Sequence, residues 1–124
     1  MVQRRTKITV ADNSGAQEMV VIHIYGGGQK MTATLGDVVK CVVKKADPLG
    51  IVKDDELVHV VIVRTRKEFH RADGSYIRFD DNAGVVVDNT PDQNPRGTRV
   101  FGPVARETKE KGFDKIASLA VDVY

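Results

Sequence analysis

The feature that most constrains the fold is a series of short, valine-rich segments separated by turn signals. Through the first two thirds of the chain, each aliphatic run is followed by glycine, proline, asparagine or aspartate. Short runs rich in β-branched residues favour strands over helices. Because no helical segment alternates with these strands, the pattern predicts a small all-β barrel or sandwich. Valines on both faces indicate a sheet that is covered or closed on itself.

Six strands and two short helices are expected. The strands are ITV at 8–10, EMVVIHIYGG at 18–27, DVVKCVVKKA at 37–46, ELVHVVIVRTRKEF at 56–69, SYIRF at 75–79 and AGVVVDN at 83–89. The segment TPDQNPRGTRVFGP, residues 90–103, holds three prolines and predicts a loop. Residues 107–111 favour a helix, Gly112 interrupts it, and the spacing of Phe113, Ile116, Ala117 and Ala120 predicts a second one.

Composition sets the broad class. The 124 residues form one domain, with the barrel at about 1–90 and the loop and helices at about 91–124. An apolar fraction of 41% predicts a globular chain with its own core. The lone Cys41 excludes an internal disulfide and suggests a reducing compartment. Neither a secretory signal nor a run long enough to span a bilayer is expected.

The motifs for catalysis and metal binding are weak. YGGGQK at 25–30 lacks phosphate-loop spacing and predicts a glycine turn. Cys41, between valines, predicts a buried thiol of raised pKa. The histidines lack zinc spacing: His23, His59 and His70.

The adjacent acids Asp80 and Asp81 would point to opposite faces of a strand, so they are expected to be solvated turn acids. No serine lies in a nucleophile-elbow motif. Together these patterns favour a binding protein over an enzyme.

The strongest positive signal is the basic hairpin RTRKEFHRADGSYIRF, residues 64–79. The net charge is only +2, so the placement of charge carries more information than its sum. Arg64 and Arg66 are expected on one strand face, and guanidinium forks match phosphate geometry. Phe69, Tyr76 and Phe79 could stack on unpaired bases. The alternative is a hairpin whose cations only protect a sheet edge.

Further basic clusters lie outside the hairpin and suit an irregular RNA surface better than one DNA groove. They are Arg4, Arg5 and Lys7; Lys44 and Lys45; and Arg96, Arg99 and Arg106.

Several longer stretches resemble one ribosomal protein family. These are ADNSGA, GDVVK, VVIVRTRKEFHRADGSYIRFDDNAGVVV, NPRGTRVFGPVARE and FDKIASLA. They are similar to the universal large-subunit ribosomal protein family number fourteen, of the bacterial or organellar type. The likeness covers residues 3–122, and the middle stretch is its most specific part.

The resemblance implies a mainly β fold: a small closed five-stranded β-barrel with a projecting β-ribbon and two short C-terminal helices. It implies a structural component of the large ribosomal subunit, with no catalytic activity, cofactor, metal, membrane or small-molecule partner. The implied partners are large-subunit rRNA, small-subunit rRNA across an intersubunit bridge, neighbouring large-subunit proteins and a ribosome-silencing factor. The implied location is a bacterial cytoplasmic ribosome, with a mitochondrial or plastid ribosome as the alternative.

The resemblance and the basic clusters together assign candidate residues. The expected rRNA-binding residues are Arg4, Arg5, Lys7, Lys30, Lys53, Arg64, Arg66, Lys67, Arg71 and Arg78. The expected intersubunit or partner-binding residues are Lys44, Lys45, Arg96, Thr98, Arg99 and Lys115. The projecting ribbon is expected around 44–53, with Pro48 and Gly50 at its tip. Its sequence, KKADPLGIVKDDE, carries aspartates where lysines are common in the family.

Two other classes of function stay open. A free RNA-binding barrel that regulates translation would be stripped from ribosomes by high salt. A small barrel enzyme would need a pocket with converging, perturbed titratable groups.

Overall fold

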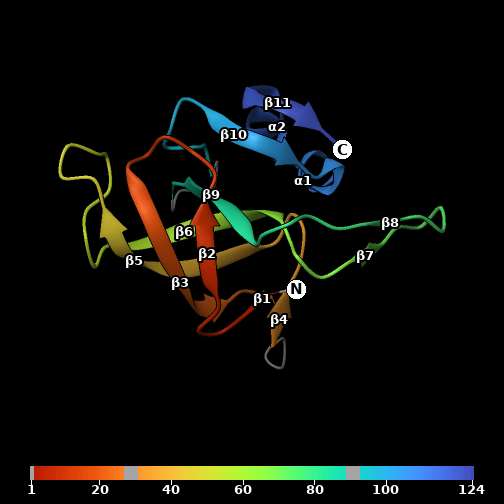
Figure 1. The fold of residues 1–124 in the computed structure, drawn as a ribbon, viewed down its shortest axis with the longest axis horizontal. Coiled ribbons are helices and arrows are strands. Elements are labelled where there is room, and N and C mark those ends of the chain that lie inside the picture. Colours follow the sequence, from red (N-terminus) through yellow and green to blue (C-terminus); the bar gives the residue numbers. More distant parts are fainter. Residues whose placement is uncertain (1, 27–30, 89–92) are drawn as a thin grey trace.

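Five strands close into a barrel in the order β2-β3-β5-β6-β9 (Figure 1). The computed structural model describes residues 2–26, 31–88 and 93–124. The barrel strands are β2 (Lys7–Val10), β3 (Ala16–Ile24), β5 (Val38–Ala46), β6 (Leu57–Arg64) and β9 (Ala83–Val87). Neighbouring strands run antiparallel except β2 and β9, whose parallel pairing closes the barrel. The predicted five-stranded barrel is therefore confirmed.

Three small sheets and two helices surround the barrel. Their bounds are β1 (Val2–Gln3), β4 (Thr32–Ala33), β7 (Phe69–His70), β8 (Tyr76–Ile77), β10 (Val100–Val104), β11 (Ala120–Val123), α1 (Arg106–Glu110) and α2 (Asp114–Leu119). β1 pairs with β4 and β7 with β8, both antiparallel, whereas β10 and β11 pair in parallel. Figure 1 shows the β7–β8 hairpin projecting from the barrel, and the helices and the β10–β11 pair lying together on one side of it.

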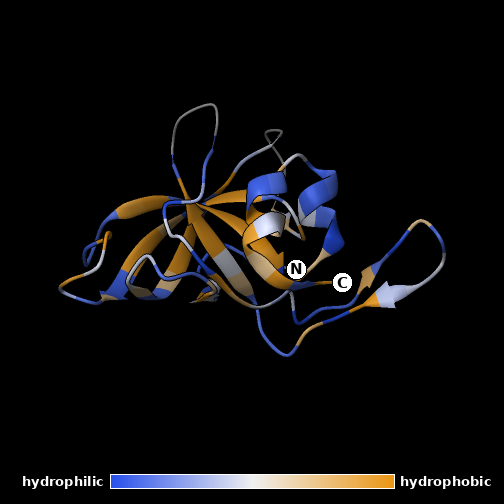
Figure 2. Ribbon diagram, turned by 90° about the horizontal axis from the view of Figure 1, so that it is seen from above, coloured by the Kyte–Doolittle hydropathy of each residue, from blue (hydrophilic) through white to orange (hydrophobic). Residues whose placement is uncertain are grey.

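β9 and most of β6 are covered on both faces, as the sequence predicts, whereas β3 and β5 alternate between buried residues and exposed or half-buried ones. One cluster of buried side chains fills the barrel and includes Met19, Val39 and Val60. A second cluster lies between the outer face of β6 and β9 and the C-terminal elements, and includes Val61 and Ile116. Figure 2 shows the hydrophobic colour concentrated on the barrel strands. Burial of both faces is what allows neighbours such as Val60 and Val61 to be apolar.

The C-terminal third differs in part from the expectation. The two helices are confirmed, separated by Gly112 at φ +99°. The predicted loop over 90–103 is wrong at its end, because β10 begins at Val100, and residues 89–92 lie outside the described residues. Pro103 belongs to this strand, and the pairing register shifts between Val100 and Pro103. Proline has no N–H, so it is tolerated only where the ladder is irregular or at an edge.

The projecting ribbon is not at residues 44–53, where the family resemblance placed it. The connection from β5 to β6 folds back against the turn after β2: the Asp47 N–H donates to the Gly15 carbonyl at 2.7 Å, and the Ile51 N–H to the Ser14 carbonyl at 2.8 Å. The expected long strand over 56–69 stops at Arg64, so the projecting element is the segment between β6 and β9, which carries β7 and β8 (Figure 1). The glycine turn expected within 25–30 and the candidate Lys30 fall largely or wholly outside the described residues.

Candidate nucleic-acid interface

Arg64 lies at the base of the hairpin and is only 8% exposed. Its Nε donates to Asp81 Oδ1 at 3.0 Å and its Nη2 to Asp81 Oδ2 at 3.4 Å. Its Nη1 donates to the carbonyls of Phe101 and Pro103, at 2.9 and 3.1 Å. The guanidinium therefore joins three segments: the end of β6, the residues just before β9, and β10. Its donors face acceptors within the protein.

Two expectations change at this point. Arg64 and Arg66 do not present their charges on one face, because β6 ends at Arg64 and only Arg66 is exposed. Asp81 is half-buried against Arg64 and is not a solvated turn acid. Asp80 is exposed, and its main-chain carbonyl accepts from Arg66 Nε at 3.1 Å.

Arg71 is likewise held within the protein. Its Nε donates to Glu107 Oε2 at 2.8 Å, and its Nη2 donates to Glu107 Oε1 at 3.0 Å. Nη2 also donates to the main-chain oxygen of Tyr124 at 2.7 Å. Arg71 thus ties the hairpin to helix α1 and to Tyr124, the residue that follows β11.

The exposed cations of the hairpin are Arg66, Lys67 and Arg78. Lys67 Nζ lies 3.2 Å from Glu68 Oε1. The pKa of the Glu68 carboxyl lies below its ordinary value, first because it accepts its own backbone N–H and then because of Lys67. These cations reach solvent along the projection, whereas Arg64 and Arg71 anchor it.

The hairpin aromatics divide into two kinds. Tyr76 is 66% exposed and stacks on His70, with ring centroids 4.7 Å apart and an interplanar angle of 17°. Phe69 and Phe79 are half-buried. Tyr76 is therefore the aromatic of the hairpin that offers most surface to a partner.

The other expected cations are exposed but lie apart from the hairpin. Arg4 and Arg5 occupy the turn after β1, where Arg5 has φ +72°, and Lys7 lies 3.6 Å from Glu18. Lys44, Lys45 and Lys53 belong to the β5 end and its connection to β6. Figure 1 shows this connection and the hairpin at opposite ends of the long axis, so the cations form several patches and not one.

The aspartates in the β5–β6 connection have a local role. Asp47 Oδ1 accepts the Leu49 N–H at 3.0 Å, and Asp54 Oδ1 accepts the Ala46 N–H at 2.8 Å. Such side-chain acceptors stabilise turns that contain Pro48 and a positive φ at Asp55. These carboxylates therefore stabilise the conformation of the β5–β6 connection.

Most of the expected partner-binding residues lie on or beside the loop before β10. Asn13 holds this loop: its Oδ1 accepts the N–H groups of Thr98 and Arg99 at 2.7 and 3.1 Å, and its Nδ2 donates to Thr98 Oγ1 at 2.8 Å. Lys115 Nζ donates to Asn94 Oδ1 at 2.6 Å. Arg99 and Lys115 are exposed beside these contacts, whereas Lys44 and Lys45 lie on the β5 end.

Asn13 was missed as a site residue, although it lies in the polar turn ADNSG. Its neighbour Asp12 is buried and accepts the Val86 N–H at 2.9 Å and the Ser14 Oγ–H at 2.7 Å. Burial raises the pKa of the Asp12 carboxyl above its ordinary value, against the hydrogen bonds from Ser14 and Val86. A polar turn that clamps a distant loop resembles any surface turn in sequence, so no local signal distinguishes it.

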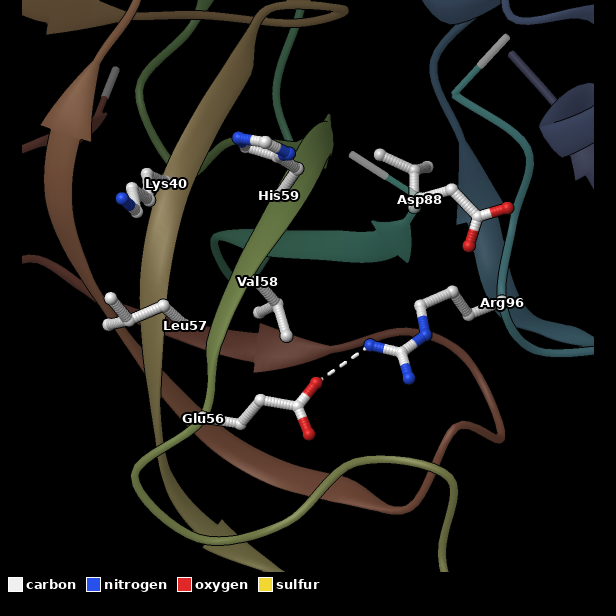
Figure 3. Close-up of a pocket in the computed structure, with 8 residues that line it drawn as sticks. Lys40, Glu56, Leu57, Val58, His59, Asp88 and Arg96 are labelled. Carbon is white, nitrogen blue, oxygen red and sulfur yellow. Dashed lines mark hydrogen bonds and ion pairs between the residues drawn. The ribbon is translucent and has the colours of Figure 1, made fainter. Parts of the chain in front are cut away.

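A hollow of about 460 Å³ lies beside β6 (Figure 3). Its charged lining residues are Lys40, Glu56, Asp88 and Arg96, and Arg96 Nη1 donates to Glu56 Oε2 at 2.7 Å across it. At its wall, His59 Nε2 lies 2.8 Å from the Tyr25 hydroxyl. Charges of both signs line the hollow, and one of its two cations, Arg96, is paired with a carboxylate.

The remaining candidates for chemistry are structural. Cys41 is fully buried in the barrel, and burial raises the pKa of its thiol to about 12, as predicted. Within residues 2–26, 31–88 and 93–124, no three His, Cys, Asp or Glu side chains are grouped to hold a metal ion. None of the helices in these ranges is long and apolar enough to cross a membrane.

The fold and the site define a class of protein: a small β-barrel with exposed cations on a projecting hairpin and on loops. Comparison with known protein families identifies the family. The whole chain, residues 1–124, matches the family described as Ribosomal protein L14p/L23e, and it belongs to that family. It is therefore a structural protein of the large ribosomal subunit, it acts in translation, and its place is among ribosomal RNA and other ribosomal proteins. Such proteins are typically not enzymes.

Proposed function

We propose that the β7–β8 hairpin contacts large-subunit rRNA through Arg66, Lys67 and Arg78. The observation that carries this proposal is the division of the hairpin arginines into two groups. Arg64 is buried and Arg71 is nearly buried, each in an ion pair, whereas the other cations are exposed on an element that projects from the barrel. Exposed cations on a projection can follow a phosphate backbone, and each contact releases counterions. The exposed ring of Tyr76 adds a stacking surface for an unpaired base.

The cations outside the hairpin would hold other parts of the same RNA. Arg4, Arg5, Lys7 and Lys53 are exposed at positions away from the hairpin. Ribosomal RNA is irregular, so separate cationic patches on one small protein can each meet a different strand. Lys30 belongs to this proposal by sequence alone.

We assign a second surface, the loop before β10, to the small subunit and to a ribosome-silencing factor. Arg96, Thr98, Arg99 and Lys115 would form it, and Lys44 and Lys45 would reach small-subunit rRNA. The hydrogen bonds that Asn13 accepts from this loop favour the assignment, because a loop held in one conformation loses little entropy when a partner binds. We propose a bacterial cytoplasmic ribosome as the location, with a mitochondrial or plastid ribosome as the alternative.

The first test is sedimentation of lysate through sucrose gradients in low and high salt. We expect the protein to follow the large subunit in stoichiometric amount and to survive the salt wash, as an integral component of the subunit would. Release by salt would instead support a free RNA-binding regulator.

The second test measures the hairpin directly. The Arg66→Ala/Arg78→Ala variant should bind protein-free large-subunit rRNA more weakly, and the slope of log affinity against log salt should fall by about 1.5. The control Lys40→Ala/Lys109→Ala removes the same charge from outside the proposed surfaces. Equal slopes for the two variants would remove the hairpin from the interface.

The third test concerns the second surface. Arg99→Ala/Lys115→Ala should leave large-subunit assembly intact and weaken subunit joining or silencing-factor binding. Normal subunit joining and factor binding would refute the assignment of this loop.

A further inference from the structure

The ion pair between Arg71 and Glu107 connects two elements that lie far apart in the sequence. Arg71 follows β7, and Glu107 lies in the first turn of α1. Both side chains are almost buried, at 12% and 7% exposure, and two hydrogen bonds of 2.8 and 3.0 Å form a fork. The main-chain oxygen of Tyr124 accepts a third bond from the same guanidinium. A buried bidentate pair has a narrow range of geometry, so it restricts how the two elements can turn against each other.

Helix α1 is in turn fixed to the barrel. The Ala105 N–H donates to the Val63 carbonyl at 3.1 Å, just before the helix. Lys111 Nζ lies 2.9 Å from Asp37 Oδ1 just after it. Because α1 is held at both ends, its position relative to the barrel is fixed. Because Glu107 is held in place relative to the barrel, its ion pair with Arg71 fixes the orientation of the hairpin relative to the barrel.

Away from this contact, the hairpin has little else to direct it. β7 and β8 pair over two residues each, through Phe69–Ile77 and His70–Tyr76. A two-stranded hairpin of this size is marginal by itself in water. Nearer the barrel, the two legs are joined by Arg64 with Asp81, by the Phe79 N–H to the Thr65 carbonyl at 2.9 Å and by Arg66 Nε to the Asp80 carbonyl at 3.1 Å. Phe79 and Arg66 tie one leg to the other and do not tie the outer part of the hairpin to α1.

We propose that the Arg71–Glu107 pair is a latch that holds the hairpin in its RNA-binding direction, and that both are positioning residues. The proposal rests on the proposed function for the consequence of that direction. A hairpin that samples several directions binds with an affinity reduced by the fraction of molecules in the competent one. The latch acts before RNA arrives, so the two residues need not touch RNA.

Two variants distinguish an effect of hairpin orientation from an effect of net charge. Arg71→Met/Glu107→Leu removes the fork and keeps the net charge, and apolar replacement of a buried pair often preserves stability. Glu107→Gln raises the net charge by one. The matched control is Glu110→Gln, on the same helix, which also raises the charge by one but breaks only an exposed pair with Arg106 at 3.7 Å.

The direction of the hairpin can be measured with two spin labels, on Ala72→Cys in the hairpin and Gln17→Cys on β3. Cys41 is fully buried and its thiol pKa is about 12, so it will not take up label in the folded protein. We expect a narrow distance distribution for the original pair and for Glu110→Gln. A broad one is expected for Arg71→Met/Glu107→Leu and for Glu107→Gln, at temperatures where thermal unfolding shows every variant folded.

Affinity for protein-free large-subunit rRNA is the second readout. Both latch variants should bind about tenfold more weakly, although Glu107→Gln gains positive charge. The slope of log affinity against log salt should be unchanged, because the phosphate contacts are the same. Unchanged distances, or broad distances with full affinity, would overturn the latch. A reduced salt slope in Arg71→Met/Glu107→Leu would also overturn it, because Arg71 would then be an RNA contact. Failure of the proposed function is a separate result: Arg66→Ala/Arg78→Ala would show the salt slope of its control.

Discussion

Arg64 Nε and Asp81 Oδ1 lie 3.0 Å apart across the base of the hairpin, where the chain leaves the barrel and returns to it. The same guanidinium also satisfies the carbonyls of Phe101 and Pro103. One side chain therefore organises three segments: the end of β6, the entry to β9 and β10. An arginine in a basic stretch can thus serve the fold while its neighbours serve binding.

Replacement of Arg64 should destabilise the protein. Arg64→Ala leaves Asp81 and two carbonyls without their donor, and we expect the free energy of unfolding to fall by about 2–4 kcal/mol, below the cost of a fully buried pair because Asp81 is partly solvated. Urea unfolding measures this. Arg66→Ala is the control, at an exposed position, and should change stability by no more than about 0.5 kcal/mol. Equal effects of the two variants would show that the buried fork does not stabilise the fold.

Gly102 should tolerate alanine less well than Gly74. Both have positive φ, +77° and +90°, so each substitution carries backbone strain of about 1 kcal/mol. A Cβ on Gly102 would come within 2.3 Å of Arg64 Nη1, whereas one on Gly74 meets nothing within 4 Å. Gly102→Ala should therefore cost at least about 1 kcal/mol more than Gly74→Ala in thermal or urea unfolding. The reverse order would show that the guanidinium moves aside without loss.

Loss of Asn13 should release the loop before β10. In Asn13→Ala the N–H groups of Thr98 and Arg99 lose their acceptor, and stability should fall by about 1 kcal/mol because the site is exposed to water. Hydrogen exchange of the two amides should quicken, whereas Asn94→Ala, which removes the contact with Lys115, should leave them protected. Unchanged exchange in Asn13→Ala would mean that other contacts hold the loop.

Asp12 should make the protein's stability depend on pH in an unusual direction for a carboxylate. Burial is the largest influence on its pKa and raises it, so the folded state favours the protonated form more than the unfolded state does. The stabilisation from this group is full below the ordinary value of 3.8 and is lost as pH rises through the raised folded pKa. The difference in unfolding free energy between the original protein and Asp12→Asn should therefore shrink over that window. A difference that grows with pH would mean that hydrogen bonds from Ser14 and Val86 outweigh burial.

The barrel strands could be predicted from the sequence because their signal is local, whereas closure into a five-stranded barrel was implied by the family resemblance. β5 and β6 follow runs of β-branched residues, and covering of both faces shows in consecutive valines such as Val60 and Val61. The short helices show in the same way, through spacing and Gly112. β10 was missed because its pairing with β11 is parallel, joins segments separated by both helices and includes Pro103, which local propensity excludes from a strand.

The roles of the hairpin arginines could not be predicted from their pattern. Arg64, Arg66 and Arg71 look alike in sequence, yet Arg64 and Arg71 are held in ion pairs because the fold brings Asp81 and Glu107 to them. The aspartates of the β5–β6 connection similarly serve main-chain N–H groups.

By itself, the sequence determined a closed, valine-rich barrel with basic appendages and membership of a ribosomal family, since periodicity, turn residues and family motifs are properties of short stretches. Only the tertiary structure decided which cations remain exposed and which element projects. The physical reason is that an ionisable side chain takes its role from the partner it meets, and those partners lie 17 and 36 residues away in the chain.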